Sequence, residues 1–475
     1  VMIAPAGHAY YVNNNSTSGD VFATAIGSNA NHGKSPAAPM ADLSALITAY
    51  HPSNGDVIYV DRGVYDVLRT VDLIRLDAGV RIVGAGPTAT ILDRHWTGAG
   101  GEIFALHDAD GVTFSKLGMT GASIGITAAE GSDSDDVRVE SSEFYGNAIA
   151  GIQFGPSNDR TTIVDNRIRD IHGSPQIGVG IEVAGANSTV ERNELFANDM
   201  GLRLAGSNSA ARDNSVHDNL KIGIYALANT LVERNRVFGQ RATDLGLFSS
   251  GGIVTSGGKI SDNSVFENTY GIRSSAAEAI VIVGGNRIFG NEIGVWADYA
   301  SSVIERNAIY SNSLGIQIAD PSGSGQPLAD VTGNLLYANR NGGILATHAF
   351  DVRVVNNTVY QPVGDAIRIQ QTTHGATLAN NIISVDAGYA LSISLDSIDG
   401  FASDRNLFQQ SGDTNAHIGL LGSTTYDSLG DWRPATGTDS HSLEADPRFV
   451  DRDGADNRLG YDPLTHVDGG ADDNF

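Results

Sequence analysis

The repeat that decides the fold is clearest in residues 190–225, VERNELFANDMGLRLAGSNSAARDNSVHDNLKIGIY. The motif apolar-x-x-Asn-x-apolar occurs twice in this stretch, around Asn193 and Asn214. Through most of the chain an asparagine returns in the same motif once every 21 to 28 residues. The asparagines of this motif are Asn166, Asn193, Asn214, Asn235, Asn263, Asn286, Asn307, Asn334, Asn357 and Asn381. A fixed period of this length indicates a repeat architecture.

Each repeat contains two or three short apolar runs separated by Asn or Gly turns. A second asparagine often follows five residues after the first, as at Asn198 and Asn219, and a Gly-apolar pair then starts the next run. Asparagine tolerates left-handed backbone and hydrogen-bonds locally, and stacked turns let one asparagine amide bond to the next. No repeat buries its apolar side alone, so neighbours must stack. The sequence therefore predicts an all-β chain, a single right-handed parallel β-helix; leucine-rich repeats share part of the period but need a denser leucine consensus.

Both ends of the chain differ from the repeat. Residues 41–50 carry apolar side chains at helical spacing, so we expect a short helix that covers the open end of the first coil. Residues 55–60 and 79–84 are predicted to form the first coil strands. Regularity fades beyond about Asn406. The expected organisation is an N-terminal strand and capping helix over 1–54, coils over 55–405, and an irregular cap with an acidic tail over 406–475.

Composition limits the functional classes. The net charge of −25 argues against nucleic acid as a partner, because phosphate binding needs a basic face. There is no cysteine and no run of 18 apolar residues, which excludes thiol chemistry and predicts no membrane span. The chain begins at Val1 with no signal-peptide pattern. We expect a mature form or a fragment of a longer bacterial protein, secreted or at the cell surface, that is a monomer or a module of a larger chain.

Residues at equal positions of successive coils should form columns about 4.8 Å apart. The residue two after each Gly-apolar glycine is expected to point outward. This column contains Gln153, Glu182, Arg203, Tyr225, Phe248, Arg273, Trp296, Gln317 and Arg368. Coil seven is ambiguous because both Gly246 and Gly252 fit its strand start. The column two before the glycine contains Asp199, Lys221, Asp244, Thr269, Glu292 and Ser313.

The first column is aromatic and basic in an acidic chain. Flat aromatic rings stack on sugars, and arginine matches carboxylates with two parallel hydrogen bonds. We interpret this face as a groove for an acidic polysaccharide. The alternative is an ordinary set of exposed strand residues, with Asp199, Lys221 and Asp244 forming a surface salt-bridge column.

Several further segments carry a family resemblance. Tyr10–Asn13, residues 55–60 and residues 79–86 resemble the N-terminal part of secreted β-helix proteins of the pectate-lyase-like superfamily. Coils 190–340 resemble its carbohydrate-binding and sugar-hydrolase repeats, and Ala445–Asp451 resembles its closing motif. The resemblance implies a right-handed parallel β-helix and a polysaccharide lyase, glycoside hydrolase, uronate epimerase, adhesin or tailspike. The Asp-Pro-His motif of alginate C5-epimerases is absent, so the resemblance does not select a reaction.

Three mechanisms stay open. In β-elimination on a uronic-acid polymer such as alginate or pectate, Arg203 and Arg273 neutralise the carboxylate, Lys221 or Tyr225 is the base, and His217 assists. A C5-epimerase needs the same groups. A hydrolase would pair Asp199 with Asp244, roughly 9.6 Å apart across two coils, or Asp199 with Glu182. A non-catalytic adhesin or stalk is the third reading. The substrate-binding residues expected beside this site are Glu182, Arg241, Arg273, Trp296 and Gln317.

Calcium is the one cofactor that the sequence raises. Asp451, Asp453 and Asp456 alternate in an acidic loop, and calcium takes six to eight oxygens from such loops. The twelve-residue pattern of an EF-hand is incomplete because it lacks the final glutamate. The alternative is a solvated acidic linker.

Overall fold

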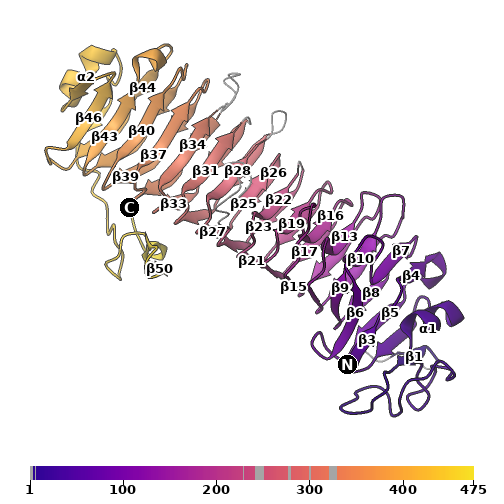
Figure 1. Cartoon of the computed structure of the whole chain (residues 1–475). Coiled ribbons are helices and arrows are strands. Elements are labelled where there is room, and N and C mark those ends of the chain that lie inside the picture. Colours follow the sequence, from indigo (N-terminus) through magenta and orange to yellow (C-terminus); the bar gives the residue numbers. More distant parts are fainter. Residues whose placement is uncertain are drawn as a thin grey trace. The chain divides into compact units, whose positions relative to one another are not determined.

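The computed structural model describes residues 4–5, 7–227, 229–240, 251–275, 280–298, 301–319 and 329–475. The chain divides into two compact units, Val1–Leu231 and Val232–Phe475. Both units are built from short parallel strands that repeat in the same three sheets, here named A, B and C (Figure 1). This arrangement is a parallel β-helix, and it confirms the predicted fold class.

In the first unit each turn of chain contributes one strand to each sheet. Sheet A contains β1 (Ala9–Val12), β2 (Val57–Val60), β5 (Arg81–Gly84), β8 (Thr113–Ser115), β11 (Arg138–Glu140), β14 (Thr162–Val164), β17 (Thr189–Glu191) and β20 (Ala210–Arg212). Sheet B contains β3 (Gly63–Asp66), β6 (Thr90–Trp96), β9 (Gly118–Ala122), β12 (Glu143–Tyr145), β15 (Arg167–Arg169), β18 (Glu194–Phe196) and β21 (Ser215–His217). Sheet C contains β4 (Val71–Ile74), β7 (Phe104–His107), β10 (Ile124–Ala128), β13 (Ala150–Phe154), β16 (Val179–Val183), β19 (Met200–Leu204) and β22 (Ile222–Ala226).

The second unit repeats this plan. Sheet A contains β23 (Leu231–Glu233), β26 (Gly258–Ser261), β29 (Val281–Gly284), β32 (Ser302–Glu305), β35 (Ala329–Thr332), β38 (Arg353–Val355), β41 (Thr377–Ala379) and β44 (Ala402–Asp404). Sheet B contains β24 (Arg236–Phe238), β27 (Ser264–Phe266), β30 (Arg287–Phe289), β33 (Ala308–Tyr310), β36 (Leu335–Tyr337), β39 (Thr358–Gln361), β42 (Ile382–Val385), β45 (Leu407–Gln410) and β48 (Leu443–Glu444). Sheet C contains β25 (Gly251–Thr255), β28 (Tyr270–Ser274), β31 (Ile293–Asp298), β34 (Leu314–Ala319), β37 (Gly342–Thr347), β40 (Asp365–Gln370), β43 (Gly388–Ile393), β46 (Ala416–Leu421) and the antiparallel β47 (Thr424–Tyr426).

The core consists of apolar columns inside the coils. In sheet C of the first unit Ile152, Ile181, Leu202 and Ile224 are register partners in successive strands, and each is fully buried. The residue after each of them points away from this column, because side chains alternate along a strand. The stacking that the repeat predicts is therefore present, and it places the outward residues of neighbouring turns side by side.

The repeated asparagines are buried and form ladders. The amide nitrogen of Asn193 donates to Oδ1 of Asn214 at 3.0 Å, and its backbone N–H donates to the same oxygen at 2.9 Å. The same bonds join Asn166 to Asn193, which confirms the predicted amide stacking. The left-handed backbone lies one residue earlier than expected, since Arg192 has a φ of 54° and the asparagine itself does not have a positive φ. The asparagine therefore follows the left-handed residue, and its side chain hydrogen-bonds to the neighbouring coil.

The predicted capping helix is present as α1 (Leu43–Tyr50). Asp42 caps it by accepting a hydrogen bond from the Ala45 N–H, and Leu43, Leu46 and Ile47 are buried. A short 3₁₀ turn, η1 (Arg75–Asp77), follows β4. The strands expected at 55–60 and 79–84 are β2 and β5.

The coil strands extend past residue 405, since β45 and β46 continue sheets B and C as far as Leu421. A 3₁₀ turn, η2 (Leu395–Ser397), precedes them, and α2 (Leu429–Thr436) follows. Trp432 of α2 is fully buried against Gly419, where a Cβ would lie 2.2 Å from the indole. This helix therefore packs on the last turn and closes it.

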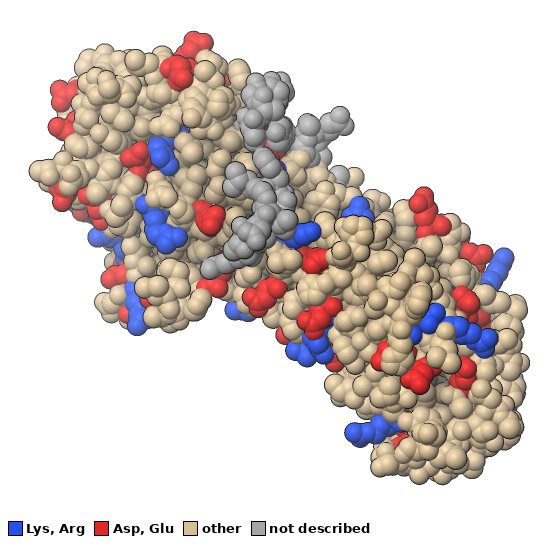
Figure 2. All heavy atoms as spheres, in the orientation of Figure 1, with Lys and Arg blue, Asp and Glu red and all other residues tan. Residues whose placement is uncertain are grey.

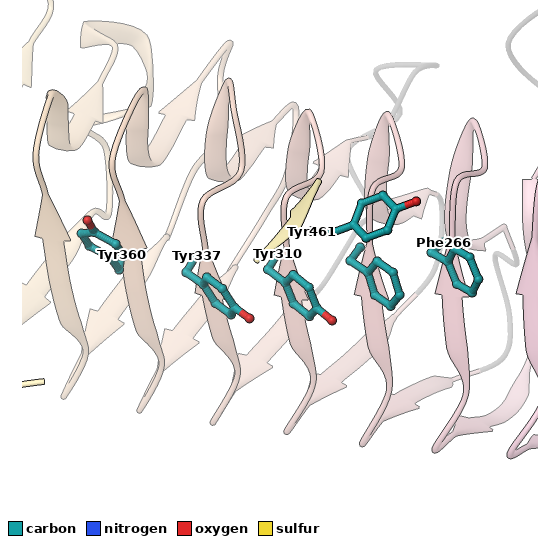
Figure 3. Close-up of a cluster of buried hydrophobic side chains, with 6 residues drawn as sticks. Phe266, Tyr310, Tyr337, Tyr360 and Tyr461 are labelled. Carbon is teal, nitrogen blue, oxygen red and sulfur yellow. The ribbon is translucent and has the colours of Figure 1, made fainter. Parts of the chain in front are cut away.

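The last thirty residues pack on the outer face of sheet B. This tail contains β49 (Tyr461–Asp462), β50 (Val467–Asp468) and η3 (Gly469–Ala471). Six strands of sheet B present stacked rings that we name the aromatic ladder: Phe238, Phe266, Phe289, Tyr310, Tyr337 and Tyr360. Tyr461 lies against the ladder (Figure 3), and Phe475 packs on Tyr337 with ring centroids 4.7 Å apart. The tail is thus an integral part of the second unit.

A charged contact holds the tail on the ladder. Asp468 accepts hydrogen bonds from Arg287 and from the Tyr310 hydroxyl, both at 2.8 Å. We expect Asp468→Asn to lower the free energy of unfolding by about 1–3 kcal/mol, because charged hydrogen bonds are lost in a half-buried site. Thermal unfolding and limited proteolysis measure this, with Asp399→Asn, an exposed site, as the control. Unchanged melting and an equally resistant tail would contradict it.

Candidate functional site

The outer face of sheet C in the first unit brings the predicted column together. Gln153, Glu182, Arg203 and Tyr225 are consecutive register partners in β13, β16, β19 and β22. All four are partly exposed. Alignment of the coils on the Gly-apolar pair therefore predicts correctly which residues become neighbours.

Three of these side chains bond to one another. Arg203 forms an ion pair with Oε1 of Glu182, and Gln153 donates to Oε2 of the same carboxylate at 2.9 Å. The Arg203 side chain remains 38% exposed and that of Glu182 17% exposed. An exposed ion pair of this kind contributes little stability, so the guanidinium can exchange Glu182 for a carboxylate of a ligand.

Asp199 lies at the start of the same strand region but serves a structural purpose. Its carboxylate accepts hydrogen bonds from the backbone N–H groups of Gly173 and Gly178, at 3.0 and 2.8 Å, and lies 3.0 Å from Nδ1 of His172. Burial of Asp199 raises its pKa, whereas the bonds from His172, Gly178 and Gly173 lower it, and the net pKa lies below the ordinary value. The carboxylate therefore fastens the 173–178 loop to the coil.

The low pKa of Asp199 predicts an acid-dependent loss of stability. Asp199 stabilises the folded state fully above its pKa in the unfolded chain, about 3.9, and this contribution is lost as the pH falls through the lower pKa of the folded state. We expect Asp199→Asn to be less stable than the wild type at neutral pH by about 1–3 kcal/mol, and the difference to shrink below about pH 4. Thermal unfolding over this pH range, with the exposed Asp218→Asn as control, tests it; a pH-independent difference would contradict it.

Lys221 follows Asp199 in the next turn, with its backbone N–H donating to the Asp199 carbonyl at 2.8 Å. Its side chain is partly exposed, and no ion pair joins it to another described residue. Tyr225 lies four residues further on, within β22. Lys221 therefore immediately precedes the strand that carries Tyr225.

His217 lies on a different face from Lys221 and Tyr225. It ends β21 in sheet B, stacks on Phe196 with ring centroids 5.2 Å apart, and contacts Asp218 at 2.9 Å and Glu194 at 3.4 Å. His217 and Lys221 are close in sequence, but the turn between them separates sheets B and C. The prediction from the sequence therefore placed His217 on the wrong face. The expected helper role at the Lys221 face has no geometric support.

Two members of the column in the second unit are buried. Arg273 and Trp296 are register partners in β28 and β31, with exposures of 8% and 5%, so the expectation that they are open to solvent is wrong. Arg273 pairs with the fully buried Asp298 and lies over the Trp296 ring, which also packs on Tyr270. Asp298 and Tyr270, which do not belong to the column, pack against these two side chains.

Other predicted column members have mixed positions. Gln317 is the partner of Trp296 and is partly exposed. In coil seven the residue aligned with Arg273 is Val254, which means that Gly252 marks the strand. Arg241, Asp244 and Phe248 lie outside the described residues. The Asp199–Asp244 pair proposed for a hydrolase therefore stays a prediction.

The acidic loop of the tail is exposed at Asp451, Asp453 and Asp456. The backbone of Asp451 exchanges two hydrogen bonds with Asn474, and the Asp456 carboxylate accepts the Arg458 N–H at 2.9 Å. Among the described residues no three His, Asp or Glu side chains are grouped as a metal site. Calcium binding in this loop stays a prediction.

The structure adds residues that pattern reading did not select. His172 and the 173–178 loop contact Asp199. The interruption of the repeat at this point was the only sequence signal that could have indicated these contacts. Arg368 has the expected place on β40, but nothing in its sequence context marks its surroundings. Figure 2 shows acidic and basic side chains interspersed on the visible face of each unit, so positive charge is gathered only locally. Within the described ranges, no helix is long and apolar enough to cross a membrane.

Comparison with known proteins identifies the coil region. Five overlapping segments, 53–209, 102–258, 150–302, 255–383 and 285–425, match the family model described as the right handed beta helix region. The uncharacterized protein YwoF of Bacillus subtilis (strain 168) is 25% identical over 224 residues, which span 46% of this chain and 40% of YwoF. The chain thus matches less than half of that relative's length.

Solved structures resemble the chain at low identity. The mannuronan C-5 epimerase AlgE6 A-module of Azotobacter vinelandii is 15% identical with a TM-score of 0.40, over 85% of this chain and 94% of that one. Pectate lyase Pel9A is 15% identical with a TM-score of 0.43, over 69% of this chain and 79% of the lyase. A mannuronic acid specific family 6 lyase from human gut microbiota is 12% identical with a TM-score of 0.42, over 76% and 82%. At these identities the likeness concerns the fold alone.

Proposed function

The chain belongs to the right-handed β-helix family, and on this premise we propose that it binds an acidic polysaccharide on the outer face of sheet C and cleaves it by β-elimination. The observation that supports the proposal most is the alignment of Arg203 with Tyr225 on adjacent strands, with Lys221 at the start of the second strand. A positive charge, a phenol and an amine, all partly exposed, thereby lie on or beside two adjacent strands of sheet C in a chain of net charge −25. This is the group set that elimination beside a carboxylate requires.

Each group has a role that follows from its place. Arg203 exchanges Glu182 for the uronate carboxylate and stabilises the charge that develops on it. Tyr225 neighbours Arg203 and, as the phenolate, takes the proton from the carbon beside the carboxylate. The electron pair forms a double bond to the next carbon while the glycosidic oxygen departs. The Lys221 ammonium gives that oxygen a proton, and proton exchange with water restores both side chains.

Two other reactions use parts of this site. A C5-epimerase would employ the same groups and return the proton from the opposite face of the sugar. Hydrolysis needs a carboxylic acid that stays protonated, whereas the pKa of Asp199 is lowered by its contacts with the 173–178 loop. Elimination is therefore the reaction that we favour over hydrolysis. A non-catalytic adhesin would bind the polymer and release no product.

A panel of acidic polysaccharides, with and without calcium, tests the proposal. We expect absorbance near the ultraviolet edge to rise with alginate or pectate, because each elimination creates a double bond conjugated to a carboxylate. New reducing ends without this absorbance would indicate hydrolysis, and unchanged chain length with altered uronate stereochemistry would indicate epimerisation. Binding without any of these signals would indicate a non-catalytic adhesin. We expect either protein, lyase or adhesin, to act outside the cell or at its surface.

A further inference from the structure

Arg368 carries a positive charge that no described acidic residue neutralises. It lies on the outer face of sheet C in the second unit, where Leu345 and Ser392 are its register partners in the neighbouring strands. Its side chain is partly exposed, but Nε is buried without a hydrogen-bond partner. Arg353 in the same unit, by contrast, pairs with Asp330 at 2.9 Å. A buried donor without a hydrogen-bond partner is costly, so the site favours an acceptor such as an anion.

The backbone beside Arg368 is shaped around its guanidinium. A Cβ at Gly342 would lie 3.2 Å from Nη2 of Arg368 and 3.1 Å from the Asp365 carbonyl oxygen. A larger residue at position 342 would therefore press on the end of the Arg368 side chain and shift it by a few tenths of an ångström. Glycine at the start of β37 leaves room for the guanidinium beside the strand.

The nearest acidic and aromatic groups are committed elsewhere. The Asp365 carboxylate accepts the Tyr389 N–H at 3.0 Å and makes no ion pair with Arg368. Tyr389 stacks on His417 with ring centroids 5.1 Å apart, and its hydroxyl contacts Thr425 at 3.1 Å. His417 in turn lies 2.6 Å from Asp427. None of these contacts involves Arg368, so its guanidinium has no acidic partner among these residues.

We propose that Arg368 is an anion subsite of the second unit that binds the carboxylate or sulfate group of an acidic saccharide. The planar guanidinium offers two parallel N–H donors to two oxygens of such a group. Gly342 provides the room for it. The choice of a saccharide as ligand rests on the proposed function, whereas the anion site rests on Arg368 and Gly342.

Calorimetric titration of the full-length chain tests the subsite with three probes: a galacturonate oligomer, its neutral methyl ester, and a sulfated galactose oligomer. We expect Arg368→Gln to weaken binding of the charged oligomer about tenfold or more, the loss of a charge-assisted bidentate contact. Arg353→Gln, which removes an exposed arginine on sheet A, should leave the affinity unchanged. Preference between the two charged probes distinguishes carboxylate from sulfate.

The outcomes separate this inference from the proposed reaction. Equal affinity of Arg368→Gln and the wild type, or equal binding of the neutral ester, would overturn the subsite even if the wild type forms unsaturated products. Weakened binding in Arg368→Gln without any unsaturated product would keep the subsite and remove the lyase. If neither charged oligomer binds the wild type, both the subsite and the proposed function are contradicted.

Discussion

Asn286→Ala should lower the free energy of unfolding by about 4 kcal/mol, because it leaves several buried polar groups without partners. The Asn286 Oδ1 accepts both the backbone N–H and the amide of Asn263, at 2.9 and 3.0 Å. Its amide donates to the carbonyl of Ile260 at 3.0 Å, to that of Gly284 at 3.2 Å and to Oδ1 of Asn307 at 3.0 Å. The residue is 1% exposed, so water does not replace these bonds.

Thermal and denaturant unfolding of Asn286→Ala measure this effect. Asn415→Ala is the matched control, because Asn415 is exposed and its side chain bonds to nearby Asp413. A difference between Asn286→Ala and the wild type within about 0.5 kcal/mol, the size of an ordinary surface substitution, would contradict the structural role of the ladder.

Tyr225→Phe and Lys221→Met should each lower kcat on the responsive polymer by roughly 10²–10⁴, the contribution of general acid–base groups. Binding of the polymer should change little, because Arg203 remains. Each variant removes the functional atom and retains most of the side-chain volume of a partly exposed residue, so melting should stay close to that of the wild type.

Two controls separate catalysis from general effects on the surface. Tyr145→Phe changes a partly exposed tyrosine on sheet B of the same unit, and Lys259→Met changes an exposed lysine on sheet A. Both should retain wild-type turnover. Full activity in Tyr225→Phe and Lys221→Met would remove this face from the mechanism.

The sequence predicted the coil register because its signal is local and periodic. The Gly-apolar pair places Glu182, Arg203 and Tyr225 in one column, as the strand pairing of β16, β19 and β22 confirms. The same reasoning left coil seven open between two glycines, and the strand pairing selects Gly252, with Val254 in the column.

The repeat pattern could not predict which side chains contact loops. Asp199 has the phase of a surface residue, yet it is 6% exposed, because it bonds to a loop whose path the sequence does not define. Arg273 is buried through Asp298, which lies at the end of the next strand of sheet C. The position of a residue within the repeat predicts its neighbours in adjacent strands, but it does not predict which loops or side chains cover it.

The position of the tail was unpredictable for a related reason. Tyr461 is 150 residues from Ser311, yet its N–H donates to the Ser311 hydroxyl at 2.8 Å. The aromatic ladder was visible only as scattered Phe and Tyr at the ends of sheet B strands. Without the fold, nothing distinguished these residues from ordinary strand aromatics.

The most direct test of the account is a crystal structure of Lys221→Met with an acidic oligosaccharide bound. The account predicts a sugar over β16, β19 and β22, with one carboxylate on Arg203 and the Tyr225 hydroxyl beside the carbon that bears it. An oligosaccharide bound only on sheet A or B of the first unit, or no sugar on sheet C at saturating concentration, would contradict it.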